Sequence, residues 1–155
     1  MNNMPLVTKN TIHHKLVLYI HHNSVNIYES NLYNSEDLMV SPNIAIGTKG
    51  ERKTFVCEHN VAPHVDKFST PSMIRLMEQA SSDSVQKYLE DDQVTVGFEV
   101  NIRHIAPADI GDAITAYAEV TEIDRNRISF QVSAFTGDTK IGEGTHKRVV
   151  ITPKK

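Results

Sequence analysis

A single carboxylate, Glu78, stands inside a stretch of the chain that is otherwise apolar enough to be buried. The stretch covers residues 69–80 and reads STPSMIRLMEQA. Its apolar side chains spread around much of a helical circumference, so more than one face of the helix needs cover. A carboxylate in that setting turns toward water, pairs with a cation, or takes part in chemistry. These three options stay open at this point.

A second candidate for chemistry is His104, which ends a stretch of alternating side chains. Apolar residues recur there at every second position, and they are Val94, Val96, Phe98, Val100 and Ile102. Counting in twos places His104 on the same face, at the end of a predicted strand. An imidazole in such a place is either a satisfied core side chain or a group that moves protons.

Other side chains that bind metals or act as nucleophiles are less well placed. The paired histidines at 13–14 and 21–22 match no closed zinc pattern, so we interpret them as solvated residues of a tail. The single cysteine, Cys57, has no histidine beside it in the sequence, and we predict a small buried or half-buried side chain. We therefore predict no metal site.

The helix that carries Glu78 is predicted to run from residue 71 to about residue 89. Thr70 is a good N-cap, because its hydroxyl can accept a hydrogen bond from an unpaired amide of the first turn. Pro71 suits the first helical position, where no backbone donor is needed. The acidic residues 90–92 mark the end of the helix.

Five stretches are predicted to be strands, one before the helix and four after it. They are residues 51–60, 94–104, 113–123, 128–134 and 140–151, with residues 61–69 as a connection. Short turns between the later strands predict an antiparallel sheet against one helix. This is an α+β, hot-dog fold, in which one long central helix is wrapped by a five-stranded antiparallel sheet. Its exposed edges predict a homodimer or a higher even oligomer.

Composition sets the limits of this interpretation. The chain has 155 residues, and we expect an asparagine-rich, poorly ordered extension at residues 1–44 and one domain at residues 45–152. A formal charge of −3 argues against nucleic acid as the main partner, and one cysteine favours a reducing, cytoplasmic setting. No apolar run near the start reaches the roughly 20 residues of a membrane-spanning helix, so no membrane partner is expected.

Three blocks, in order and with their spacing kept, carry a resemblance to a known family. They are residues 69–80, residues 95–104 (TVGFEVNIRH) and residues 141–148 (IGEGTHKR). With them the chain resembles the fluoroacetyl-CoA thioesterase-like hot-dog proteins. The resemblance implies hydrolysis of an acyl-CoA to the free acid and CoA, without a cofactor.

The same resemblance implies roles for particular residues. It implies catalytic roles for Thr70, Glu78 and His104. It also implies that Gly97 and Arg148 lie near the substrate. Upstream of the helix the chain departs from the specialised fluoroacetyl enzyme, because residues 65–68 stand where that enzyme has a longer, aromatic-bearing segment. We therefore expect a small or medium acyl group and broad selectivity.

The chemistry of thioester hydrolysis suits these residues. It needs a carboxylate that activates water or attacks the carbonyl, and Glu78 suits either role. His104 can donate to the acyl oxygen or move a proton to the leaving thiol, and the amide of Gly97 is open to close approach. Thr70 and Glu78 are about 12 Å apart along one helix. Either the thioester spans that gap or two protomers share the site, and we favour the shared site.

Structural interpretations stand beside these roles. Thr70 can be a cap alone, Glu78 a solvated or salt-bridged residue, Gly97 a bulge, and Arg148 a surface cation. The rival function is a non-catalytic acyl-CoA or acyl-carrier binding module that keeps the fold. A hydratase ranks last, because it would need an Asp/His pair on a loop after the helix.

Overall fold

The computed structural model describes residues 16–21, 24–29 and 39–153, and the chain divides into two compact units, Met1–Asn34 and Ser35–Lys155. In the first unit, β1 (Leu16–His21) and β2 (Ser24–Glu29) pair as an antiparallel hairpin. The predictions made for His13, His14 and His22 lie outside the described residues. The assignment of residues 1–44 as an extension stays a prediction.

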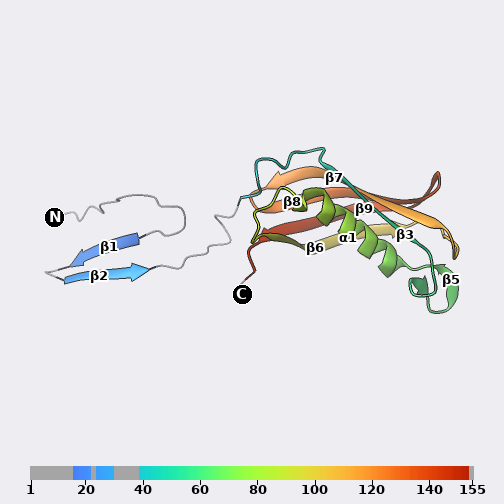
Figure 1. Ribbon diagram of the computed structural model, residues 1–155, viewed down its shortest axis with the longest axis horizontal. Helices are drawn as coiled ribbons and strands as arrows, with labels where there is room; N and C mark the ends of the chain where they lie inside the picture. Colours follow the sequence, from blue (N-terminus) through green and yellow to red (C-terminus); the bar gives the residue numbers. More distant parts are fainter. Residues whose placement is uncertain (1–15, 22–23, 30–38, 154–155) are drawn as a thin grey trace. The chain divides into compact units, whose positions relative to one another are not determined.

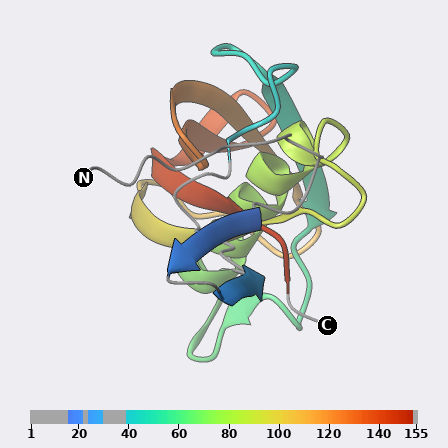
Figure 2. The same ribbon diagram turned by 90° about the vertical axis from the view of Figure 1, so that its left-hand side faces the viewer.

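One antiparallel sheet forms the frame of the second unit, with its strands in the order β3-β7-β8-β9-β6. The strands are β3 (Lys49–Phe55), β6 (Val94–His104), β7 (Ala113–Asp124), β8 (Arg127–Thr136) and β9 (Thr139–Ile151). The helix α1 (Thr70–Gln86) lies across one face of this sheet (Figure 1). Turned by 90°, the molecule shows α1 inside the curve of the strands (Figure 2). The predicted α+β arrangement of one helix and five antiparallel strands is confirmed.

The core lies between α1 and the concave face of the sheet. Strands β7 and β8 alternate as predicted, and their buried residues are Ile114, Ala116, Ala118, Val120, Ile128, Phe130, Val132 and Ala134. From the helix, Met73 and Met77 are buried against them. A Cβ atom at Gly142 of β9 would collide with the Met73 thioether, so this glycine lets the helix approach the sheet closely. Close packing here fixes which helical side chains face the strands.

The helix begins one residue earlier than predicted. Ser69 is the N-cap: its backbone is extended, and its hydroxyl accepts a hydrogen bond from the Ser72 amide at 3.3 Å. Thr70 is therefore the first helical residue rather than the cap, and Pro71 is the second, where its missing N–H is still harmless. The Thr70 hydroxyl is left available for another partner.

The first strand is shorter than predicted and ends at Phe55. The Asn60 side chain closes a turn there: it accepts from the Cys57 amide at 2.8 Å and donates to the Phe55 carbonyl at 2.9 Å. Cys57 is exposed on this turn, so the prediction of a buried or half-buried cysteine is wrong. In place of a plain connection, β4 (Val61–Ala62) and β5 (Val65–Phe68) form a small hairpin before α1.

A bulge divides β6, so the common apolar face predicted for residues 94–104 is wrong. The pairing of β6 with β9 shifts between Gly97 and Glu99. An extra residue in one strand reverses which side chains face the core. Before the shift the odd-numbered Thr95 is buried on the helix side, and after it the even-numbered His104 lies there, in contact with Thr70. A bulge at Gly97 was one of the two interpretations of this glycine.

Candidate active site

At the start of α1, a threonine meets a histidine from the end of β6. Thr70 Oγ1 lies 3.0 Å from His104 Nδ1. We call these two residues the threonine–histidine pair. His104 Nε2 is buried and has no hydrogen-bond partner in the described part of the chain. The pair therefore has one polar atom that a further group can satisfy.

Two turns further along α1, the carboxylate of Glu78 lies against the bulge in β6. Its side chain is 37% exposed, and Oε1 is 3.8 Å from Nε2 of His146. A Cβ atom at Gly97 would lie 2.8 Å from this oxygen and 2.8 Å from Cε1 of His146. Both distances are shorter than van der Waals contact, so the carboxylate and the imidazole occupy the space that a side chain at residue 97 would need.

Arg148 of β9 ties the helix to β6 from the buried side. Its Nε donates to Thr95 Oγ1 and its Nη2 to the Thr95 carbonyl, both at 2.8 Å. Its Nη1 donates to His146 Nε2 at 3.1 Å and to the Glu78 carbonyl at 3.4 Å. We call Glu78, Thr95, His146 and Arg148 the glutamate cluster. Its members come from α1, β6 and β9, so the hydrogen bonds of the cluster depend on how these three elements pack against one another.

The electrostatics of the cluster follow from its burial. Burial is the main cause that lowers the pKa of His146, and the Arg148 charge adds to it, while a hydrogen bond to the Glu99 carbonyl and the Glu78 charge act the other way. Burial also lowers the pKa of Arg148, and the Glu78 charge opposes that shift. Burial therefore favours a neutral imidazole, while the guanidinium stays charged because its ordinary pKa lies far above neutral pH.

The candidate residues fall into two groups within one chain. Thr70 and His104 form the first, and Glu78, Gly97 and Arg148 meet in the second. No hydrogen bond or ion pair joins Glu78 to His104 among the described residues; the imidazole beside Glu78 is that of His146.

Sequence reasoning gave no role to two members of the glutamate cluster, His146 and Thr95. His146 stood only as one letter of the block at 141–148. Its alternation with Arg148 and Val150 was the available signal, because these three residues face the helix together and are all buried.

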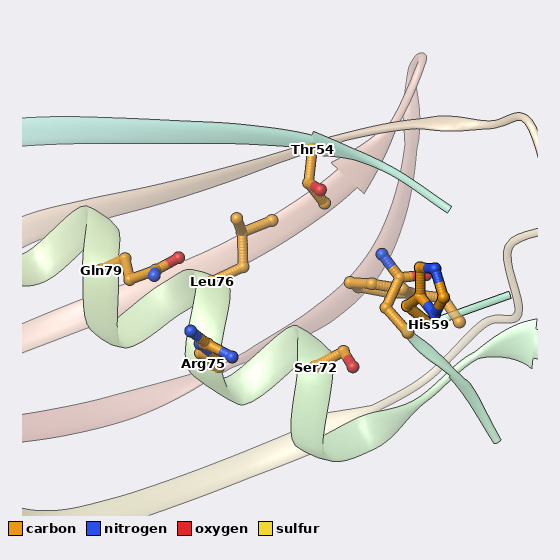
Figure 3. Close-up of a pocket in the computed structure, with 8 residues that line it drawn as sticks. Thr54, His59, Ser72, Arg75, Leu76 and Gln79 are labelled. Carbon is orange, nitrogen blue, oxygen red and sulfur yellow. The ribbon is translucent and has the colours of Figure 1, made fainter. Parts of the chain in front are cut away.

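A separate pocket of about 260 Å³ opens on another face of α1. It is lined by Thr54, His59, Asn60, Phe68, Ser72, Arg75, Leu76 and Gln79. Figure 3 shows that the helix supplies Ser72, Arg75 and Gln79, while His59 comes from the turn after β3. None of the five candidate residues lines this pocket, so we assign the pocket no role in the proposed reaction.

The described residues contain no group of three His, Cys, Asp or Glu side chains that could hold a metal ion. In that same part of the chain, no helix is both long enough and apolar enough to cross a membrane.

Comparison with known proteins adds the family. Residues 51–154 match the family of the fluoroacetyl-CoA-specific thioesterase. The chain belongs to this thioesterase family. One relative, the fluoroacetyl-CoA thioesterase of Streptantibioticus cattleyicolor, is 36% identical over 88 residues, which are 57% of this chain and 63% of the relative. The chain thus spans less than two thirds of that relative's length.

Solved structures agree with the family and with the fold. A mutant of the fluoroacetyl-CoA-specific thioesterase FlK, in complex with fluoroacetate and CoA, superposes with a TM-score of 0.67 at 29% identity, covering 70% of this chain and 96% of that one. A hot-dog-like protein from Thermanaerovibrio acidaminovorans gives a TM-score of 0.66 at 22% identity, covering 70% and 84%. The predicted hot-dog fold of this thioesterase family member is confirmed.

Proposed function

We propose that the protein is an acyl-CoA thioesterase that hydrolyses a small or medium acyl-CoA to the free acid and CoA. The observation that carries the proposal is the setting of Glu78: a half-buried carboxylate beside the bare backbone of Gly97, with Arg148 bonded to its own carbonyl. The thioesterase family gives this setting its chemical context.

Glu78 has two routes to the products. As a base, it takes a proton from water while the water oxygen attacks the thioester carbonyl, and it returns that proton to the departing CoA thiolate. As a nucleophile, it forms a mixed anhydride and expels the thiolate, and water then cleaves the anhydride. In both routes negative charge develops on the acyl oxygen, and the Gly97 amide and the Arg148 charge are its candidate stabilisers.

We propose that the threonine–histidine pair of one protomer acts together with Glu78 of a second protomer. Thr70 and Glu78 are about 12 Å apart along one helix, so one thioester carbonyl cannot touch both within a chain. The free edge of β6 carries exposed apolar residues, namely Val94, Val96, Phe98 and Val100. Among the described strands β6 pairs only with β9, and edge pairing with a second copy would cover these side chains. We therefore propose a homodimer whose two chains share each site.

The substrate class rests on the relatives and on the short segment before α1. FlK is a fluoroacetyl-CoA-specific thioesterase, and one of its structures holds fluoroacetate and CoA. In this chain the segment before the helix is the two-stranded hairpin β4–β5. The small size of this hairpin favours broad selectivity for small or medium acyl groups rather than specificity for one fluorinated substrate.

The test is the release of free thiol from acyl-CoAs of graded chain length, measured for the wild type and for Glu78→Ala and Glu78→Gln. Loss of a general base or nucleophile lowers kcat by about 10²–10⁴-fold. Asp83→Asn is the matched control, because Asp83 is an exposed acid on the same helix that pairs with Arg52; its kcat should equal that of the wild type.

Two outcomes would contradict the proposal. Tight binding of acyl-CoAs with no thiol release from any of them would indicate the binding module instead. A fully active preparation that sediments as a monomer would remove the shared site while leaving the hydrolase in place.

A further inference from the structure

His146 is a buried titratable side chain that the proposed chemistry does not use. It is 1% exposed, and its ring stacks on Phe130 with centroids 6.3 Å apart and planes at 27°. Polar atoms contact it on both nitrogens: Nδ1 is 2.9 Å from the Glu99 carbonyl oxygen, and Nε2 is 3.1 Å from Nη1 of Arg148. A buried imidazole with two such bonds is held in one orientation.

These two bonds define the protonation state of the ring. A carbonyl oxygen only accepts, so Nδ1 carries the hydrogen. A guanidinium only donates, so Nε2 keeps its lone pair. Only the neutral tautomer with hydrogen on Nδ1 satisfies both bonds, and the lowered pKa of His146 favours the same neutral form.

His146 supplies the hydrogen-bond acceptor for the one guanidinium nitrogen of Arg148 that Thr95 does not bond. Thr95 takes two of the guanidinium nitrogens, Nε and Nη2, at 2.8 Å each. The third nitrogen, Nη1, has the His146 lone pair at 3.1 Å and only the longer contact of 3.4 Å to the Glu78 carbonyl. Without the imidazole acceptor, the nitrogen nearest to Glu78 keeps only its weakest bond.

We propose that His146 is a positioning residue, which as a neutral hydrogen-bond acceptor keeps Nη1 of Arg148 in place beside Glu78. The inference rests on the proposed thioesterase function and deepens it. His146 lies 3.8 Å from the Glu78 carboxylate without a hydrogen bond to it; in this scheme it acts through Arg148, whose Nη1 also contacts the Glu78 carbonyl. The absent side chain at Gly97 leaves the room that the imidazole needs.

Two variants separate this role from a purely structural one. In His146→Gln the amide oxygen reaches about where Nε2 stands and can accept from Arg148. In His146→Asn the amide nitrogen stands near Nδ1 and can donate to the Glu99 carbonyl, but nothing accepts from Arg148. We expect kcat for acyl-CoA hydrolysis to fall about 10- to 100-fold in His146→Asn with KM changed little, because small displacements at a site have effects of this size. His146→Gln should stay within a few-fold of the wild type.

The opposite ranking would overturn the proposal, because it would mean that the bond to Glu99 is the one that matters. Equal activity of both variants and the wild type would overturn it too, with the thioesterase itself intact. If the wild type releases no thiol, the proposed function fails and takes this inference with it.

A measurement on the wild type covers the case in which both variants unfold. Nitrogen chemical shifts of the His146 ring report its tautomer directly. The neutral ring with hydrogen on Nδ1 at pH 7 is the expected result. A ring with hydrogen on Nε2, or a charged ring at that pH, would refute the hydrogen bond from Arg148.

Discussion

The threonine–histidine pair and the glutamate cluster lie at two places along one helix and are built in opposite ways. The pair is a single contact between Thr70 and His104, and the second ring nitrogen of His104 has no partner among the described residues. In the glutamate cluster, the polar atoms of Arg148 and both ring nitrogens of His146 are bonded. We call the pair open, because one ring nitrogen is unbonded in the described part of the chain, and the cluster closed, because every side-chain nitrogen of Arg148 and His146 is bonded.

This difference indicates different duties. A buried polar atom without a partner is unfavourable, so the open pair is suited to receive a group from outside the chain, either substrate or a second protomer. A closed network of charge-assisted bonds resists movement and holds its members in fixed places. We infer that the cluster sets the position of Glu78, while the pair completes the site.

Of the substitutions that test this comparison, Gly97→Ala should have the largest effect on kcat. The new methyl group would lie 2.8 Å from Glu78 Oε1 and from His146 Cε1, so the carboxylate must move. Displacement of a reacting group by about 1 Å lowers rates on the order of 10²-fold. We therefore expect kcat to fall by about that factor, measured by thiol release per folded molecule.

Gly50→Ala is the matched control for this substitution. Its methyl group would meet the Ala80 carbonyl at 2.5 Å and the Ser84 Cβ at 2.6 Å, and neither of these residues belongs to the glutamate cluster. An extra methyl group in a closely packed place destabilises by about 1–3 kcal/mol. Gly50→Ala should therefore lower stability more and activity less than Gly97→Ala. The reverse ranking would separate Gly97 from the chemistry.

A smaller effect is expected from the open pair, tested by a double-mutant cycle with Thr70→Val and His104→Gln, whose amide stands near Nε2 and leaves no partner for Thr70 at the place of Nδ1. Each change removes the same hydrogen bond, so each should lower kcat about tenfold. The double variant should be scarcely worse than either single one, so the coupling free energy should be close to the cost of one change, about 1.4 kcal/mol for a tenfold loss. Steady-state thiol release from the four proteins measures it.

Ser69→Ala provides the control for the cycle. Ser69 is the helix cap, so its loss should lower the free energy of unfolding by about 1 kcal/mol. Thr70→Val should lower stability far less, because Thr70 is not the cap. Additive losses of kcat in the cycle would mean that Thr70 and His104 act separately.

Much of the fold could be predicted because its signals are local. The alternation in residues 113–134 and the apolar helix around Met73 depend only on side-chain type and spacing. The errors arose where a single residue changes the geometry. Asn60 ends the first strand early through its side chain, and the extra residue at the β6 bulge reverses the faces that counting in twos assigns.

The candidate site was predictable in its residue types and less so in its pairings. Thr70, Glu78 and Gly97 came from blocks that resemble a family, but a block does not say which side chains touch. His146 of β9 lies beside Glu78 of α1 only because the helix packs on the sheet there and Gly97 of β6 leaves room for both side chains. Contacts between residues far apart in sequence are set by packing, which no local pattern records.

The smallest predicted effect is a pH dependence of stability that belongs to the closed cluster. Burial lowers the pKa of His146 below its ordinary value of about 6.5, with Arg148 and Glu78 as the charged groups that face it. Just below that value the unfolded chain binds a proton that the folded chain does not. The free energy of unfolding should therefore fall as pH decreases through and below about 6.5, down to the lowered pKa of the folded state.

Urea titrations of the wild type and of His146→Gln at several pH values between 7.5 and 5.5 isolate this contribution. Glutamine does not titrate, so the variant should lose less stability than the wild type over the same range. All other titrating groups are common to both proteins, and their contributions cancel in the difference. Equal slopes would mean that the imidazole takes up a proton as readily in the folded chain as in the unfolded one, and the closed cluster would then not hold its histidine neutral.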